Sequence, residues 1–402
     1  ILWTGNEEKG LCFFYETRWN WTSDSKKTYS VEKKGDTVYV TVCVAETLPV
    51  GKPFTFEFGL LGTPMRKLAP NYPFDLLGES YFSPLNRPGR RPTCDVSELT
   101  ADDWKRGSDL GCFFGDIPTE AGRIRDENIK FALDKYEKGR NTRPTAYTCA
   151  RHLSVKYPEV AAYIPSWTFK PEVAMDYTHT GHFVYDCCPT TTANDFFMWK
   201  YRQQLKRYPE LKGIYLDFGV THACSNEDHG CREKTTLLGQ REFYRRLCVV
   251  QVEAGIKDPV VVIHNTAFVQ GPAVSFVSHF LNGEHIRQAS SPILHQKKDI
   301  LDTYGIEMFA SELSTLPWGV SNSAYFPVDR LTEANGGDEP ADLYKFRMNK
   351  ATMGSCLVHN TMHALWRCHF GLFDKIVRFY DAFGVAKTAK FVGYWKKPAA
   401  VK

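Results

Sequence analysis

The stretch GIYLDFGVTHACSNEDHGCRE (residues 213–233) joins a short apolar run to a polar loop. The run IYL ends at Asp217, and a helix-like segment, LGQREFYRRLCVVQVEAG (238–255), follows the loop. A short apolar strand that leads through a loop into a helix is one βα unit of a parallel sheet. We therefore predict that Asp217 lies at the carboxyl end of a buried strand.

The same βα pattern recurs along most of the chain. Further predicted strands are short apolar runs that finish in polar or aromatic residues, namely RPTAYTCARH (143–152), HFVYDCC (182–188), VVVIHNT (260–266), SFVSHFLNGE (275–284), EMFASE (307–312) and SCLVHNT (355–361). Helix-like stretches between them include ENIKFALDKYEKG (127–139), NDFFMWKYRQQLKRYP (194–209) and YKFRMNKATMG (344–354). Seven or eight such units predict an α/β fold, a closed (β/α)8 barrel of the TIM type. No GxGxxG or GxxxxGK[ST] motif follows any strand, which argues against a nucleotide-binding open sheet.

Residues 1–65 show a different pattern, with runs rich in β-branched and aromatic residues around a Lys-Gly-Asp turn. This pattern is typical of antiparallel strands. We predict a β-sandwich segment over residues 1–65, incomplete on its N-terminal side, and a catalytic barrel over residues 66–402. Because the chain begins with Ile1 rather than Met, we expect a mature product or a piece of a longer protein.

The composition is that of a globular protein with many rings. Of 402 residues, 43% are hydrophobic, 14% aromatic and 24% charged, which excludes a disordered or coiled-coil chain. A formal charge of +4 without runs of like charge gives no support to a nucleic-acid partner. No stretch approaches the roughly 20 apolar residues of a membrane span. The 12 cysteines are too few for a disulfide scaffold.

Three predicted strand ends carry candidate catalytic carboxylates. Asp217 ends the predicted fourth strand, Glu284 the sixth and Glu312 the seventh. Strand ends of a barrel converge on one face, and glycosidic bond cleavage uses one carboxyl as acid and another as nucleophile, base or stabiliser of positive charge. Asp217 and Glu284 lie on alternate strands, which favours them as the pair, while Glu312 stays a candidate nucleophile. The alternatives are a helix cap or ion-pair partner for Asp217 and an ion-paired surface residue for Glu312.

The loop after Asp217 is rich in metal-ligand types. Cys224, His229 and Cys231, with His222, offer four ligands for zinc, although their spacing lacks the C-x2-C that makes zinc motifs specific. A disulfide between the two cysteines is an equal alternative if the protein is exported, and a third alternative is neither. We expect no cofactor, with zinc as an open alternative.

Other polar and aromatic residues at predicted strand ends are candidates for binding a carbohydrate. They suit hydroxyl recognition or ring stacking on a sugar face, and they comprise Arg151, Asp186, Tyr215, Asn226, His229, His264, Asn265, Trp318 and His359. For each aromatic residue, filling the core is the alternative. The sequence shows no GxSxG, HExxH or Ser-x-x-Lys anchor for esterase, peptidase or β-lactamase chemistry.

Several segments together resemble the glycoside hydrolase family 123-like proteins of bacterial polysaccharide utilisation. They are LWTGNEEKGLCFFYETRWNW near the N-terminus, then YPEVAAYIPSWTF, DCCPTTTANDFFMWKY, GIYLDFGVTHACSNEDHGC and FLNGEHIR. The resemblance implies an exported bacterial barrel glycosidase flanked by β-sandwich domains. That family is similar to other hexosaminidases in using an adjacent Asp-Glu pair, but Phe218 follows Asp217 here. The departure moves the expected acid to Glu284, a layout similar to that of α-galactosidase-type barrels.

These observations predict a glycoside hydrolase acting on an oligo- or polysaccharide, with a galactose- or hexosamine-type residue favoured. Asp217 would be the nucleophile or charge stabiliser and Glu284 the acid/base. Two other classes stay open: a non-catalytic glycan-binding barrel, and a zinc-dependent hydrolase that uses the Cys/His loop. The oligomeric state cannot be predicted from the sequence.

Overall fold

The structure is a computed structural model. It describes residues 1–21, 28–48, 51–68, 76–78, 113–117, 119–120, 123–124, 142–155, 157–177, 182–232, 234–265, 269–284, 300–325 and 341–363, with short pieces between 372 and 396. The expected helix over 127–139 lies outside the described residues. Within the described ranges, no helix is both long enough and apolar enough to cross a membrane.

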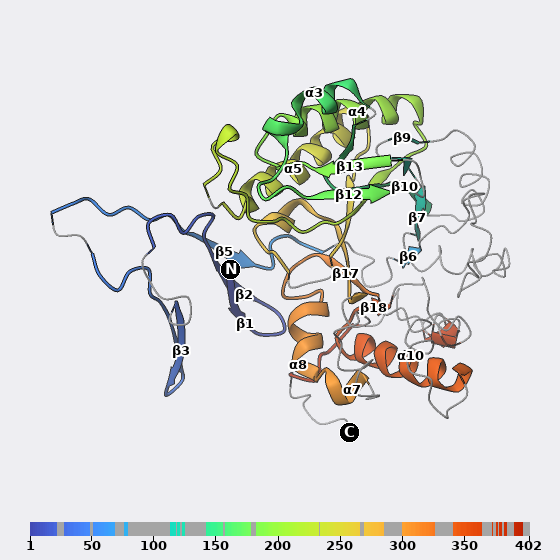
Figure 1. Ribbon diagram of the computed structural model, residues 1–402. Coiled ribbons are helices and arrows are strands. Elements are labelled where there is room, and N and C mark those ends of the chain that lie inside the picture. The colour runs from blue at the N-terminus through green and yellow to red at the C-terminus, as the bar shows by residue number, and fades with distance from the viewer. Residues whose placement is uncertain are drawn as a thin grey trace.

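An eight-stranded parallel sheet forms the centre of the molecule (Figure 1). Its strands are β6 (Leu76–Gly78), β7 (Phe113–Ile117), β10 (Thr142–Cys149), β14 (Gly213–Asp217), β15 (Val260–His264), β16 (His279–Asn282), β17 (Ser321–Ala324) and β18 (Met362–His363). Each strand pairs with the next one along the chain, as in a singly wound (β/α)8 barrel. The pairings between described residues include none between β18 and β6, so they show the parallel sheet but not its closure.

The sheet is buried on both faces, as expected for parallel strands covered by helices. β15 is buried at every position, and β14 at all but Asp217. Ile214 and Leu216 pack in one core cluster with Phe243 and other residues of α4 (Ala193–Arg207) and α5 (Leu237–Glu253). Because side chains alternate along a strand, Tyr215 and Asp217 face the other side of the sheet, as does His264 of β15.

The two long helices carry the apolar stripe that this packing requires. Phe243, Leu247 and Val250 of α5 are buried at helical spacing, and so are Phe197 and Tyr201 of α4. Phe197 meets Phe243 edge to face, with ring centroids 5.0 Å apart. The predicted helices over 194–209 and 238–255 are therefore confirmed, and the third predicted helix lies within α10 (Ala341–Val358).

Three predicted barrel strands are wrong. Residues 182–188 contribute β13 (His182–Asp186) to a separate antiparallel sheet, with β11 (His152–Ser154) and β12 (Ala174–Tyr177) on either side. Residues 307–312 belong to the short helix α8 (Ile306–Met308) and a π-helix (Phe309–Leu313). Residues 355–361 form the end of α10 and the turn after it. Asp217 still ends the fourth strand, since β6, β7 and β10 precede it in the sheet.

The remaining elements are short. They are α3 (Pro158–Trp167), the 3-10 turns Glu227–His229 and Ala273–Phe276, α7 (Ile300–Thr303), and the strand pair β8 (Thr119–Glu120) and β9 (Arg123–Ile124). In Figure 1, α3, α4 and α5 gather at one end of the molecule and α7, α8 and α10 at the other.

The N-terminal residues form antiparallel strands, as predicted. β1 (Leu2–Gly5), β2 (Gly10–Phe14) and β5 (Gly59–Thr63) make one sheet, and β3 (Tyr29–Lys34) pairs with β4 (Thr37–Val42) in a hairpin. The sheet packs against the part of the chain that carries the parallel sheet through Trp3, whose ring lies 5.0 Å from that of Trp318.

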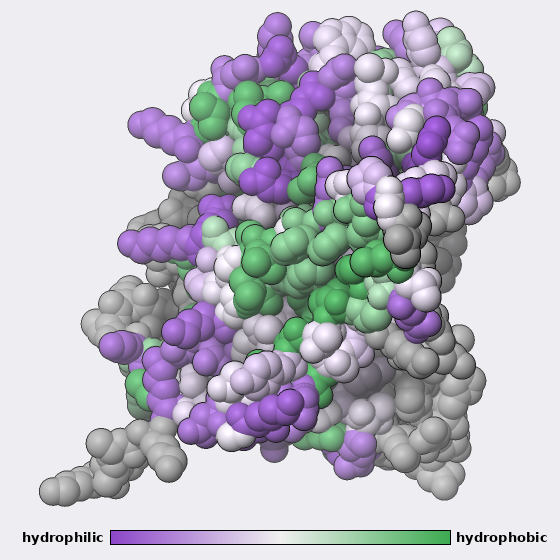
Figure 2. Space-filling model, turned by 90° about the vertical axis from the view of Figure 1, so that its left-hand side faces the viewer, coloured by the Kyte–Doolittle hydropathy of each residue, from purple (hydrophilic) through white to green (hydrophobic). Residues whose placement is uncertain are grey.

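The outer side of these N-terminal strands is apolar. Leu11, Phe56, Phe58 and Leu60 are all exposed, and the rings of Phe13 and Phe58 stack on one another. Figure 2, which views the molecule from the side where these strands lie, shows a band of apolar surface across its middle. Exposed apolar side chains therefore line this side of the N-terminal segment.

Candidate active site

Asp217 and Glu284 meet through one imidazole ring. His264 Nδ1 lies 3.1 Å from Asp217 Oδ1, and His264 Nε2 lies 3.4 Å from Glu284 Oε2. The three residues come from the ends of β14, β15 and β16, which are neighbours in the sheet. Side-chain exposures of 25% for Asp217 and 19% for Glu284, against 6% for His264, leave the carboxylates accessible while the ring is buried. The Asp217 and Glu284 carboxylates thus lie on either side of the buried His264 imidazole, at the carboxyl edge of the sheet.

The backbone around Asp217 holds its carboxylate in place. Phe218 donates its N–H to Asp217 Oδ1 at 2.9 Å, and Gly219 donates to the carbonyl of His264 at 2.8 Å. Phe218 takes the left-handed conformation with φ 55°, which is uncommon for an aromatic residue. Its ring rests on His152 with centroids 4.9 Å apart. Phe218 therefore turns the backbone directly after Asp217 while its N–H holds the Asp217 carboxylate.

Arg151 and Asp186 form a buried ion pair beside this edge. Arg151 Nε and Asp186 Oδ1 are 3.1 Å apart, and both side chains are 1% exposed. Arg151 also donates to Asp186 Oδ2 at 3.2 Å, to Gln240 Oε1 at 2.5 Å and to the Val220 carbonyl at 2.9 Å. His222 Nε2 approaches Asp186 Oδ2 at 3.5 Å. Arg151 thus donates to groups of the protein itself, and Asp186 accepts from Arg151. We infer that the pair fixes β13 against the loop after Asp217 and does not contact substrate.

Glu312 lies on a π-helix instead of a strand end. Its carbonyl oxygen accepts hydrogen bonds from the side chains of Asn282 and Asn322, at 3.4 and 3.1 Å. Asn282 ends β16 two residues before Glu284, which places the π-helix against the sixth and seventh strands. Burial raises the pKa of the Glu312 carboxyl.

The loop that carries Cys224, His229 and Cys231, called the cysteine loop below, contacts a further cysteine that the spacing of the motif did not predict. Ligand atoms of Cys188, Cys224, His229 and Cys231 all lie within 4.8 Å of one another. Cys188 follows β13, far from the loop in sequence, and it takes the fourth place expected for His222, which pairs with Asp186. Every cysteine in the described ranges is a free thiol, so the proposed disulfide between Cys224 and Cys231 is not formed.

Two of the predicted sugar-binding residues make hydrogen bonds that fix the conformation of this loop. Asn226 is fully buried, donates to the carbonyls of Pro165 and Thr168, and accepts from the Asp228 N–H. His229 places Nδ1 2.8 Å from the Ser166 carbonyl and Nε2 3.3 Å from Cys224 Sγ. These bonds give both residues a part in shaping the loop.

Four other predicted binding residues are buried. Tyr215 lies within β14, two residues before Asp217 and on the same face of the sheet. Asn265 donates its N–H to the Leu281 carbonyl at 2.9 Å. Trp318 precedes β17, packs on Trp3 and donates Nε1–H to the Ser311 carbonyl at 3.1 Å. His359 follows α10, with Nδ1 2.7 Å from the Ser355 carbonyl and Nε2 3.2 Å from the Tyr394 hydroxyl. Trp318 and His359 therefore lie just before the amino ends of β17 and β18, not at carboxyl ends, because the segments that carry them are not the predicted strands.

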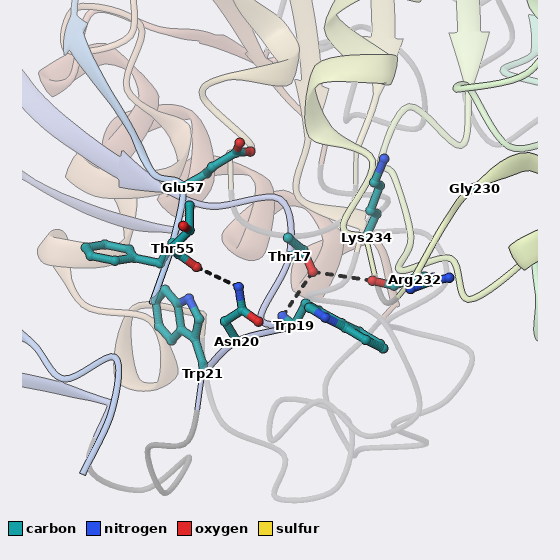
Figure 3. Close-up of a pocket in the computed structure, with 10 residues that line it drawn as sticks. Thr17, Trp19, Asn20, Trp21, Thr55, Glu57, Gly230, Arg232 and Lys234 are labelled. Carbon is teal, nitrogen blue, oxygen red and sulfur yellow. Dashed lines mark hydrogen bonds between the residues drawn. The ribbon is translucent and has the colours of Figure 1, made fainter. Parts of the chain in front are cut away.

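A pocket of about 310 Å³ lies where the N-terminal segment meets the cysteine loop (Figure 3). It is lined by Trp19, Trp21, Glu57, Arg232 and Lys234, among others. The Arg232 guanidinium lies 5.2 Å from the centre of the Trp19 ring. None of the predicted site residues lines it, so it is separate from the Asp217 and Glu284 pair.

Solved structures provide the comparisons for this chain. No family model matches it, and no curated protein does, so the family resemblance stays a prediction. A mutant of Kfla1895 in complex with cyclobis-(1->6)-alpha-nigerosyl matches with 11% identity and TM-score 0.49, over 94% of this chain and 56% of its own. A cycloalternan-degrading enzyme from Trueperella pyogenes has 13% identity and TM-score 0.45, over 83% and 51%. An alpha-galactosidase from Lactobacillus brevis has 8% identity and TM-score 0.42, over 77% and 40%. The chain thus spans about half the length of the first of these proteins.

Proposed function

We propose that the chain is a glycoside hydrolase that cleaves with Asp217 and Glu284. The observation that carries the proposal is the single imidazole of His264 between the two carboxylates, at 3.1 and 3.4 Å. Two carboxyl groups at the carboxyl edge of a parallel sheet, both partly exposed, are what glycosidic bond cleavage needs. A closed barrel is part of the proposal, because eight parallel strands in chain order are the strand sequence of one.

The two carboxylates take different roles in the proposed reaction. Glu284 donates a proton to the glycosidic oxygen as its bond to the anomeric carbon breaks, and Asp217 attacks that carbon or stabilises its positive charge. In a retaining reaction, water then attacks the anomeric carbon, loses its proton to Glu284 and displaces Asp217. A separation of about 5 to 5.5 Å between the carboxyl groups in the substrate complex would fit retention, and about 6.5 to 9.5 Å inversion.

His264 positions the two carboxyl groups of this pair. A neutral imidazole donates from one ring nitrogen and accepts at the other. With the proton on Nδ1, His264 donates to Asp217 and supports its ionised form. Nε2 then faces Glu284 Oε2 at 3.4 Å and orients that carboxyl group. His264 is a positioning residue in this account, since its ring is buried.

The finer parts of the proposal rest on the family resemblance alone. A galactose- or hexosamine-type sugar is favoured on that ground, and so is an exported location in a bacterium. The absence of an Asp-Glu pair at Asp217 and Phe218 argues against a mechanism that uses the substrate's own acetamide.

Two neutral substitutions test the proposal. Asp217→Asn and Glu284→Gln keep the shape of each side chain but remove its charge. On a polysaccharide or alkyl glycoside substrate found by screening, each should lower kcat by about 10²- to 10⁴-fold. Glu253→Gln is the matched control, because Glu253 lies on the exposed face of α5 and pairs with Arg202. Full hydrolysis by correctly folded Asp217→Asn and Glu284→Gln proteins would refute the assignment.

A second candidate function is glycan binding without cleavage, and the pocket in Figure 3 favours it. Two tryptophans beside Glu57, Arg232 and Lys234 offer ring faces and hydrogen-bond groups for a sugar. If the chain only binds, Trp19→Ala should abolish binding on a glycan array, whereas Glu284→Gln should leave it unchanged. Turnover that depends on Glu284 would exclude this alternative as the sole function.

A further inference from the structure

The cluster formed by Cys188, Cys224, His229 and Cys231 lies apart from the proposed carboxylate pair. Three thiols and one imidazole converge from two distant parts of the chain, with all ligand atoms within 4.8 Å of one another. We propose that these four side chains bind one zinc ion in a closed, structural site. This inference goes beyond the proposed glycosidase activity and does not depend on it.

Two distances within the cluster are close to the edges of a zinc tetrahedron. Zinc–sulfur bonds of about 2.3 Å and a zinc–nitrogen bond of about 2.05 Å imply edges of about 3.8 Å between two sulfurs and about 3.6 Å between sulfur and nitrogen. Cys188 Sγ lies 3.9 Å from Cys231 Sγ, and Cys224 Sγ lies 3.3 Å from His229 Nε2. An ion would therefore enter with little movement of the ligands.

The surroundings prepare each ligand for a metal. His229 Nδ1 lies 2.8 Å from the Ser166 carbonyl, which fixes the proton on Nδ1 and leaves the Nε2 lone pair for the ion. The Thr190 hydroxyl lies 3.0 Å from Cys188 Sγ and 3.3 Å from Cys231 Sγ, where it can donate to a metal-bound thiolate. Supporting hydrogen bonds of this kind orient metal ligands and adjust their basicity.

Burial and donor type make the site structural rather than catalytic. Cys188, Cys224 and Cys231 are fully buried and pack with Phe169 in one cluster. Zinc in catalytic sites keeps a fourth position for water, whereas four protein ligands fill the tetrahedron. The cluster therefore does not support the zinc-dependent hydrolase considered from the sequence, and a set of three thiolates and one imidazole is a common structural zinc set.

The ion would connect segments that carry the proposed active site. Cys188 lies two residues after Asp186 of the buried ion pair, and Cys224 and Cys231 lie in the loop that follows Asp217. Ser166, which holds His229, belongs to α3. The described regular structure of that loop is the 3-10 turn Glu227–His229 and the antiparallel bridge between Cys224 and Lys234, so zinc would add a cross-link from these short elements to the segment after β13.

The direct test is the metal content of the whole chain, purified without added metal and dialysed against EDTA. We expect about one equivalent of zinc, its loss in Cys188→Ser, and its retention in two controls. Cys43→Ser removes a thiol from the N-terminal segment, and His222→Ala removes the histidine that spacing alone would choose as fourth ligand. Removing zinc with a stronger chelator under reducing conditions should lower the melting temperature by several degrees, and adding zinc should restore it.

Two results would overturn the proposal without relying on a variant that folds. One is a native chain without zinc whose reduced form takes up no stoichiometric zinc from solution. The other is a native chain in which mass spectrometry finds a disulfide between Cys224 and Cys231. Zinc that is retained equally by Cys188→Ser would also contradict it, because the ion would then be adventitious.

Discussion

Arg151 and Phe218 show how single residues shape the proposed site. Both follow neighbouring strands in the left-handed conformation, with φ 63° and 55°. For residues other than glycine this conformation costs about 1 to 2 kcal/mol, and it persists where the surroundings over-determine it. The bonds of Arg151 to Asp186 and the contact of Phe218 with His152 supply that support. Backbone strain is thus concentrated beside Asp217.

Removing one partner of the buried Arg151–Asp186 ion pair should lower the free energy of unfolding more than removing both partners. Arg151→Met leaves the Asp186 carboxylate buried without its main partner, so we expect the free energy of unfolding to fall by about 3 to 5 kcal/mol. In the double variant with Asp186→Leu no uncompensated charge is left, and the loss should be clearly smaller. Urea denaturation of the three proteins measures both values. A single variant as stable as the double variant would contradict this account of the pair.

At the scale of secondary-structure elements, long helical periods and wholly apolar runs could be predicted from the sequence, whereas short runs of mixed polarity could not. α4 and α5 have apolar residues at helical spacing, and β14 and β15 are apolar runs bounded by turns, so each pattern has one interpretation. The runs EMFASE and SCLVHNT are too short for periodicity to separate a strand from a buried helix. Both are helical or end a helix, and Glu312 and His359 were therefore placed at strand ends that do not exist.

The cluster of cysteines shows a second limit of the sequence. Cys224, His229 and Cys231 could be read as ligands from their local spacing, but Cys188 joins them only through the packing of β13 beside the loop. The one signal available was its position in DCCPT, directly after an apolar run. The sequence predicts His264 as a sugar ligand, whereas its place between Asp217 and Glu284 follows from the adjacency of β14, β15 and β16 in the sheet.

The π-helix gives a prediction about pH. Because burial raises the pKa of Glu312, the folded protein holds this proton more tightly than the unfolded chain does. The stability contributed by the protonated form is present below the unfolded pKa of about 4.3 and is lost as the pH rises through the folded pKa. Glu312→Gln should therefore be more stable than the wild type at neutral pH, with the difference shrinking on acidification. Denaturation at several pH values measures it, and a constant difference would contradict the prediction.

At the scale of the whole molecule, the N-terminal sheet packs on the α/β part of the chain around the parallel sheet. Trp3 contacts Trp318, and its Nε1–H donates to the Thr63 hydroxyl at 3.0 Å. The Met65 N–H donates to the Trp318 carbonyl at 2.9 Å, beside the proposed boundary near residue 65. We keep that boundary as a proposal about sequence organisation, with the two parts joined by a packed interface.

A pair of tryptophan variants tests this coupling. Trp3→Ala removes a half-buried ring from the interface, and we expect a loss of about 2 kcal/mol in the free energy of unfolding. Trp19→Ala in the same segment removes a ring that is 58% exposed, and its effect should stay within about 0.5 kcal/mol. Equal effects of the two substitutions, measured by denaturant unfolding, would show that the interface adds no stability.

The central claim is that Glu284 protonates the leaving group while Asp217 acts at the anomeric carbon. The most direct measurement is kcat/KM of Glu284→Gln on two glycosides of the same sugar, one with a phenol leaving group that needs no proton and one with an alkyl alcohol that does. The account predicts that Glu284→Gln loses about 10²-fold or more on the alkyl glycoside relative to the aryl glycoside. Equal losses on both substrates, or no loss on either, would contradict it.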